Sequence, residues 1–234
     1  MSCLAPCRRD ADGAGGSVLV IVLMGMLVLS AVTLAAVLLA TADTLAASNQ
    51  RDARVALYSA EFSVERAASE LVGRADWDAV LSGAATSAFV DGPPSGPRVL
   101  ADGRTIHLEQ IANLANCGAA ASCSAASREA VTEDRPWRLN NPHWHPFSYG
   151  FTNAGGPGGA IYVVVLVADD PSENDADPDR DGVAPGNPGA GILLLRGEAF
   201  GPGASRRSIE VTVARVSYAS GPAAARFLSW REVR

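Results

Sequence analysis

The chain has 234 residues, of which 48% are hydrophobic and 19% charged, enough for one globular domain with an appendage. This apolar content argues against wholesale disorder. The formal net charge is −6 and no run of basic side chains exceeds two residues, which argues against a groove for nucleic-acid phosphates.

The first predicted element is a stretch without charged side chains at residues 17–41. As a helix rising about 1.5 Å per residue, it is long enough to cross a hydrocarbon core of about 30 Å. The preceding leader is hydrophilic and offers Arg8 and Arg9 as cytoplasmic charges. A cleaved secretory signal is the alternative, with Ala40-Thr41-Ala42 as its cleavage site, but the apolar part of such signals spans only about 7–15 residues. We therefore expect a transmembrane helix over residues 17–41.

The helix is predicted to continue through residues 42–73. Neither proline nor glycine occurs between Asp43 and Val72, so nothing breaks the helix there. Apolar side chains recur at helical spacing, which makes this half amphipathic, at Leu57, Ala60, Val64, Ala67, Ala68 and Leu71. A cleaved signal peptide is not expected to continue into an amphipathic helix, so this continuation argues against one.

A short polar leader that ends in glycine and is followed at once by an apolar helix resembles the start of a type IV prepilin. The family's peptidase cuts after this glycine, so the resemblance implies that residues 1–16 are a leader ending at Gly16 and that Ser17 is the methylated first mature residue. Residues 48–54 and 58–61 (SNQRDAR and YSAE) also resemble PilX-type minor pilins. The resemblance covers about the first 75 residues and implies that the helix joins a filament bundle through Val18, Leu19, Ile21 and Leu23.

The fifth mature position separates this chain from major pilins, which carry glutamate where this chain has Ile21. A carboxylate in lipid or in a helix bundle needs a partner, which the family supplies from a neighbouring subunit's amino terminus. A subunit at the end of a filament has no such neighbour above it. The departure therefore favours a priming or capping subunit over a shaft subunit.

The resemblance implies a non-enzymatic minor pilin with a single-pass inner-membrane helix and a periplasmic head, which then reaches the pilus tip at the cell surface. Its implied partners are other minor and major pilins, the inner-membrane assembly platform and the prepilin peptidase; no nucleic acid is expected. Two alternatives stay open: a type II secretion minor pseudopilin, and a signal-anchored periplasmic binding protein or hydrolase.

Residues 74–234 are predicted to form a β-rich head. Glycines and prolines make residues 73–98 a linker of turns, and Asp102-Gly103 indicates a tight hairpin between residues 99–101 and 105–108. The apolar run at residues 160–168 predicts a buried central strand, followed by strands at 191–200, 208–218 and, as a closing edge, 226–233. The fold class is therefore α+β, with the long N-terminal helix packed on a C-terminal antiparallel sheet.

Two of the four cysteines fall in the head, as Cys117 and Cys123 of CGAAASC; Cys3 and Cys7 lie in the leader. Outside the cytoplasm a disulfide between Cys117 and Cys123 is the default, with free thiols as the alternative. A zinc site is disfavoured because two further ligands would be needed and the spacing does not fit.

An acidic loop between two predicted strands contains Asp175, Asp177, Asp179 and Asp181. The last three, with Gly182, fit the first positions of a calcium loop, but the position of the bidentate glutamate falls on Pro188, which excludes an EF-hand. A looser calcium cage that uses Asp169, Asp170 or Glu173 remains a candidate, against the alternative of a solvated acidic loop. Calcium is the one cofactor that the sequence suggests.

The histidines do not indicate a catalytic centre. His143 and His145 are bracketed by Pro142 and Pro146, and the nearest acidic residue along the sequence is Asp134, so a loop that packs Trp144 and Phe147 is favoured over a metal site. His107 is expected to be an ordinary exposed side chain. No nucleophile elbow, phosphate-binding loop or HExxH motif occurs, so we expect no enzymatic activity.

Overall fold

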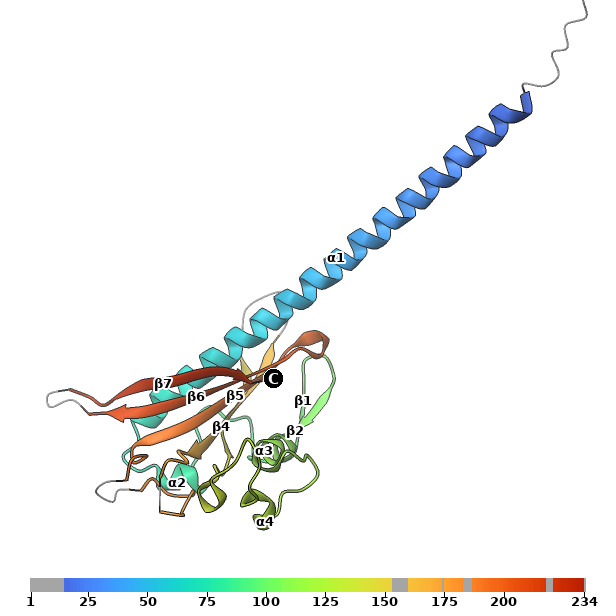
Figure 1. Ribbon diagram of the computed structural model, residues 1–234. Coiled ribbons are helices and arrows are strands. Elements are labelled where there is room, and N and C mark those ends of the chain that lie inside the picture. Colours follow the sequence, from blue (N-terminus) through green and yellow to red (C-terminus); the bar gives the residue numbers. More distant parts are fainter. Residues whose placement is uncertain (1–14, 153–159, 174, 183–186, 218–220, 234) are drawn as a thin grey trace, which may run out of the picture. The chain divides into compact units, whose positions relative to one another are not determined.

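A computed structural model describes residues 15–152, 160–173, 175–182, 187–217 and 221–233. The chain divides into two compact units, Met1–Ser48 and Asn49–Arg234. One helix, α1 (Gly15–Val72), runs without interruption through the described part of the first unit and into the second (Figure 1). The long helix predicted for residues 17–72 is therefore confirmed.

The second half of α1 supplies one side of a hydrophobic core within the second unit. Its buried stripe follows the predicted helical spacing from Ala60 through Val64, Ala67 and Ala68 to Leu71, but Ala56 takes the place of the predicted Leu57, which is only partly buried. Small side chains at most of these positions let the helix backbone lie close to the sheet. The helix ends at Val72, and the N–H of the following Gly73 donates to the Glu70 carbonyl at 3.2 Å.

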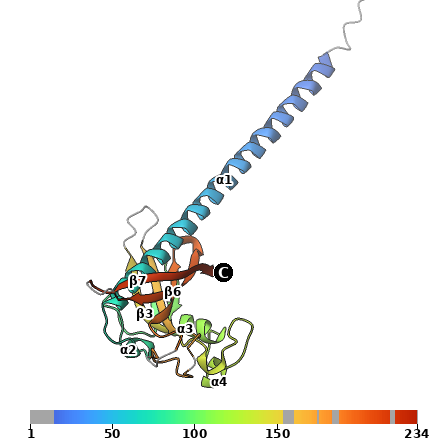
Figure 2. The same cartoon turned by 60° about the vertical axis from the view of Figure 1, so that its left-hand side comes forward.

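Five antiparallel strands form a meander in the order β3-β4-β5-β6-β7. Figure 1 labels β4 to β7 in this sheet, and Figure 2 shows the sheet, with β3 labelled, after a turn of 60°. Their bounds are β3 His145–Thr152, β4 Ile161–Asp169, β5 Ile192–Phe200, β6 Arg206–Val216 and β7 Ala224–Val233. The predicted strands at 160–168, 191–200, 208–218 and 226–233 correspond to β4–β7, which confirms the α+β class. Tyr218 lies outside the described residues.

Strand β4 is buried along its whole length because both faces of the sheet are covered there. Val163, Val165 and Val167 belong to the core beneath α1, whereas Tyr162, Val164, Leu166 and Ala168 belong to a second core. The second core also contains side chains of helix α3 (Leu108–Cys117) and of the segments around it, namely Leu100, Leu108, Ile111, Trp144 and Tyr149. Two covered faces explain the continuous apolar run in the sequence.

The segment after α1 consists largely of turns, as predicted, but it also closes one end of the first core. It contains the one-turn helix α2 (Asp78–Leu81), and Trp77, Val80 and Leu81 are buried. The Trp77 indole Nε1–H donates to the Leu71 carbonyl at 2.9 Å. These contacts make the segment part of the folded head.

The predicted hairpin exists as β1 (Pro97–Val99) and β2 (Thr105–His107), but residues 100–104 join the strands in place of a two-residue turn. Leu100 is drawn into the second core, and its N–H donates to the Arg104 carbonyl at 2.7 Å to close the loop. Helix α3 follows β2 directly and was not predicted; Gly118 ends it in the left-handed region with φ +67°. The remaining short elements are α4 (Ala125–Arg128) and the 3₁₀ turns η1 (Arg138–Asn140) and η2 (Pro202–Ala204).

The loop predicted around His143 and His145 is wrong in part, because strand β3 begins at His145, opposite Val167. Pro146 is tolerated because the register shifts between Pro146 and Ser148, and a proline at a bulge removes no ladder hydrogen bond. Trp144 and Phe147 are both buried, as expected.

Candidate functional site

The apolar half of α1 is an exposed surface over the residues of the first unit that the structure describes. Between Val18 and Leu39, sixteen large apolar side chains are 46–71% exposed, among them the predicted bundle residues Val18, Leu19, Ile21 and Leu23. Among the described residues, α1 is the one helix long and apolar enough to cross a membrane. The peptide bond between Gly16 and Ser17 lies in the first turn of this helix.

Polar groups in this half of α1 are bonded within the helix. The hydroxyl of Ser30 donates to the Met26 carbonyl at 2.8 Å, and that of Thr33 reaches the Leu29 carbonyl at 3.0 Å. Thr41 bonds the Leu38 carbonyl in the same manner. These hydroxyl donors are therefore satisfied inside the helix, as a dry environment requires.

The disulfide between Cys117 and Cys123 is present, with a Cα–Cα distance of 5.7 Å, and confirms the predicted pairing. Cys117 is the last residue of α3, and Cys123 precedes α4. The bond closes a small loop in which the Asn113 side-chain amide also donates to the Ala120 carbonyl at 3.2 Å. The disulfide holds the C-terminal end of α3 beside the second core.

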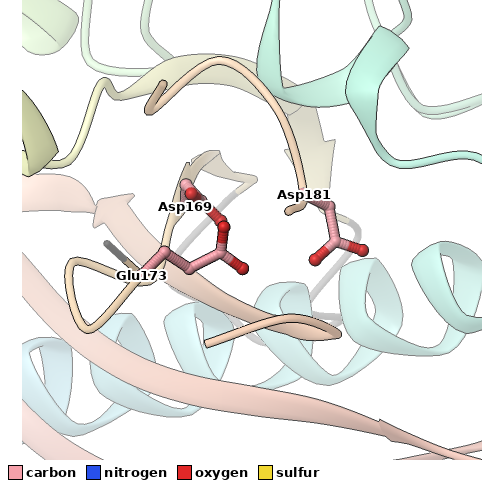
Figure 3. Close-up of side chains that lie close together, drawn as sticks. All are labelled: Asp169, Glu173 and Asp181. Carbon is pink, nitrogen blue, oxygen red and sulfur yellow. The ribbon is translucent and has the colours of Figure 1, made fainter. Parts of the chain in front are cut away.

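Three carboxylates converge where β4 ends: Asp169, Glu173 and Asp181, hereafter the acidic cluster (Figure 3). One oxygen from each lies within 4.8 Å of the others. Only 3% of Asp169 and 1% of Glu173 is exposed, and Asp181 is half-buried. Sequence reasoning named Asp181 as a site residue and the other two as additional ligands.

Backbone and amide donors hold the outer oxygens of the cluster. Glu173 Oε2 accepts from the Gly182 N–H at 2.9 Å and from the Asn187 side-chain amide at 3.2 Å, and Asp181 Oδ1 accepts from the Gly191 N–H at 2.7 Å. Asp169 Oδ1 and Glu173 Oε1 have no hydrogen-bond partner among the described residues. The cluster therefore contains buried acceptors that lack donors.

Burial and mutual repulsion disfavour negative charge in the cluster. Desolvation, followed by the neighbouring charge of Glu173, raises the pKa of Asp169 to about 9. Desolvation, with the charges of Asp175 and Asp181, raises the pKa of Glu173 to about 7. The pKa of Asp181 is also raised by burial, although the positive charge of Arg215 acts against this shift.

Asp177 and Asp179 lie outside the acidic cluster, whereas the Asp175 carboxylate lies beside Glu173, whose pKa it helps to raise. Asp179 Oδ1 is 3.0 Å from His143 Nδ1 and 3.6 Å from His145 Nε2, a pairing that the sequence separation concealed. Burial, the largest effect, lowers the pKa of His145, and Asp179 opposes it. Asp175 Oδ1 accepts from the Asp177 N–H at 3.1 Å, a local turn within the loop. The four aspartates therefore do not meet at one point.

Comparison with known proteins identifies the N-terminal segment. Residues 15–65, about one fifth of the chain, match the family model described as PilX N-terminal. Searches of curated proteins and of solved structures returned no match. The N-terminal segment of the chain is therefore similar to the PilX N-terminal family, whose members are pilins of type IV pili.

Proposed function

We propose that this protein is a non-enzymatic minor pilin that primes or caps a type IV pilus filament. The observation that carries the proposal is the exposed apolar half of α1, which coincides with the region matched by the PilX N-terminal model. Such a surface needs lipid or other helices to cover it. A filament bundle of similar helices supplies that cover after the helix leaves the bilayer.

The amphipathic half of α1 supports the same role. Tyr58 and Phe62, one helical turn apart, are 64% and 56% exposed and lie away from the core stripe. Large exposed aromatic side chains are typical of contact surfaces with partners. We propose that these two residues continue the bundle contact into the head.

Processing between Gly16 and Ser17 tests the proposal directly. Intact-mass analysis of the membrane-extracted protein should give a chain that starts at Ser17 and carries an N-methyl group. Gly16→Val adds a branched side chain where the peptidase backbone must approach closely, so this variant should stay full-length and be absent from sheared filaments. Gly25→Val is the matched control, because the same change in open space on the same helix should leave processing intact.

Two other mature termini would contradict the proposal. A chain that begins near Asp43 would show an ordinary secretory signal, and one that keeps residues 1–16 in wild-type cells would show a signal anchor. Co-purification with secretion-system subunits in place of pilus subunits would move the protein to type II secretion.

Ile21 supports the proposed tip position, because it would be the fifth residue of the mature chain, where a shaft subunit would carry a partnered glutamate. Immunogold labelling of sheared filaments should place the head at one end only. Labelling along the shaft would refute a priming or capping role and leave the broader pilin function in place.

A further inference from the structure

We propose that the acidic cluster of Asp169, Glu173 and Asp181 binds a calcium ion. The three residues come from the last position of β4, the turn after it and the segment before β5, so a bound ion would tie the two ends of the β4–β5 connection together. Figure 3 shows the three carboxylates turned toward a common space.

Two buried oxygens without donors carry the argument. Asp169 Oδ1 and Glu173 Oε1 are buried and unpaired among the described residues, and they belong to side chains that are 97–99% covered. An unpaired buried carboxylate oxygen is costly, and buried charges in proteins are paired or coordinate metals. A cation between the three groups would satisfy both oxygens at once.

The hydrogen bonds and ion pairs of the arginine side chains nearby go to groups outside the cluster. The Arg215 guanidinium lies 3.9 Å above the Trp77 ring and donates to the Arg74 and Ala75 carbonyls. Arg180 Nε is 3.4 Å from an Asp78 oxygen. In the described parts of the chain, no arginine or histidine forms an ion pair with the acidic cluster.

The donor set selects a hard cation. Carboxylate oxygens without histidine or cysteine suit calcium or magnesium and not zinc or copper. Calcium accepts six to eight oxygens at irregular angles, whereas magnesium needs a near-ideal octahedron, which an irregular loop does not supply. Hydrogen bonds from Gly182 and Asn187 already fix the outer oxygen of Glu173, so its inner oxygen is held toward the ion.

Gly182 is needed for this arrangement. A Cβ at that position would lie 2.5 Å from Glu173 Oε2 and 2.5 Å from Asp175 Oδ2, so any side chain would push the carboxylates apart. The periplasmic or external location, which rests on the proposed function, would expose the site to calcium at the concentrations that extracellular modules bind, about 10⁻⁴–10⁻³ M.

The test uses the full chain purified in detergent. Titration calorimetry with calcium chloride should give one site with a dissociation constant of about 10⁻⁵–10⁻³ M, and magnesium chloride should bind at least tenfold more weakly. Calcium at ten times this constant should raise the melting temperature by about 3–6 °C over the protein in chelator. Equal melting curves in calcium and in chelator would overturn the proposal, because protonation would then neutralise the cluster.

Matched substitutions separate the cluster from general charge effects. Asp169→Asn and Asp181→Asn should each weaken calcium binding at least tenfold, while Asp177→Asn, in the same loop but outside the cluster, should change it less than twofold. In chelator, Asp169→Asn should melt no lower than the wild type because the neutral amide is close in shape to the protonated carboxyl group it replaces, which shows that the variant folds. An equal loss of binding in Asp177→Asn would refute the assignment. Calcium binding does not depend on a pilus. If this protein binds calcium but proves to be cytoplasmic or secreted, only the proposed function is refuted.

Discussion

The close approach of α1 to strand β5 depends on Gly197, and Gly197→Ala tests it. An ideal Cβ at this position would lie 2.5 Å from Val64 Cγ2, 3.0 Å from the Ala60 carbonyl oxygen and 3.4 Å from Ile209 Cγ1. Val64 cannot turn away easily, because a buried valine in a helix has one strongly preferred rotamer. The helix and the sheet must therefore separate to admit the methyl group.

Overpacking of this kind costs about 1–3 kcal/mol of unfolding free energy. For a domain of about 150–250 residues, 2 kcal/mol lowers the melting temperature by about 4–8 °C. Tryptophan fluorescence of the detergent-purified chain can follow unfolding, because Trp77 and Trp144 are buried. Gly73→Ala is the control: its Cβ meets the Glu70 carbonyl oxygen at an ordinary 3.4 Å, and we expect a change below about 0.5 kcal/mol.

A double-mutant cycle shows whether the clash is with Val64. Val64→Ala alone should destabilise the head by about 2 kcal/mol through the cavity it leaves. Combined with Gly197→Ala, the new methyl group occupies part of that cavity, so the double variant should be at least about 1 kcal/mol more stable than the sum of the single effects. Strict additivity, or a neutral Gly197→Ala, would refute the argument that glycine sets the distance between helix and sheet.

Three further predictions follow from side-chain contacts. Alkylation of the folded, unreduced protein should leave Cys117 and Cys123 unlabelled, and labelling of both would contradict the disulfide. Reduction should lower the unfolding free energy by about 2 kcal/mol for a ring this short. In chelator, the unfolding free energy should fall as the pH rises from about 7 to about 9, because the raised pKa values of Asp169 and Glu173 mean that the folded chain holds more protons at these sites than the unfolded chain. The lowered pKa of His145 acts in the opposite direction only at lower pH, so a flat or rising profile above pH 7 would refute this. Glu198→Gln should lower the unfolding free energy by about 2 kcal/mol, because this buried carboxylate accepts from two arginine side chains at 2.6–3.1 Å. An unchanged midpoint in urea would show that these pairs contribute nothing to stability.

The elements that sequence could predict are those with long or repeated patterns. The stripe from Ala60 to Leu71 and the uniform run in β4 each reflect burial along one element, so periodicity alone is sufficient to find them. Helix α3 was not predicted because it is only ten residues long and begins immediately after a strand. Its buried positions, Leu108 and Ile111, and the terminating Gly118 were signals that could have indicated it.

The acidic loop shows why site geometry could be predicted only in part. The spacing of Asp177, Asp179 and Asp181 suggested a shared set of ligands, yet the folded loop directs Asp179 to a histidine and Asp181 to the end of β4. Spacing along the sequence does not determine which side of an irregular loop a side chain faces. Asp169 and Glu173 are buried beside Asp181 because of the path that the loop takes over the sheet. That path is tertiary information, which spacing along the sequence does not contain.

The exposed half of α1 limits the environments in which the folded chain can exist. Burial of a large apolar side chain is worth about 2 kcal/mol, so sixteen such side chains at about 60% exposure leave about 20 kcal/mol unrealised in water. That exceeds the net stability of a typical domain, about 5–15 kcal/mol, so lipid or other helices must cover the surface. Because Ser30, Thr33 and Thr41 bond their own helix carbonyls, movement between two dry environments breaks none of these hydrogen bonds. The proposed transfer from bilayer to filament is therefore nearly neutral in burial, and packing and register between neighbouring helices must supply the preference for the filament.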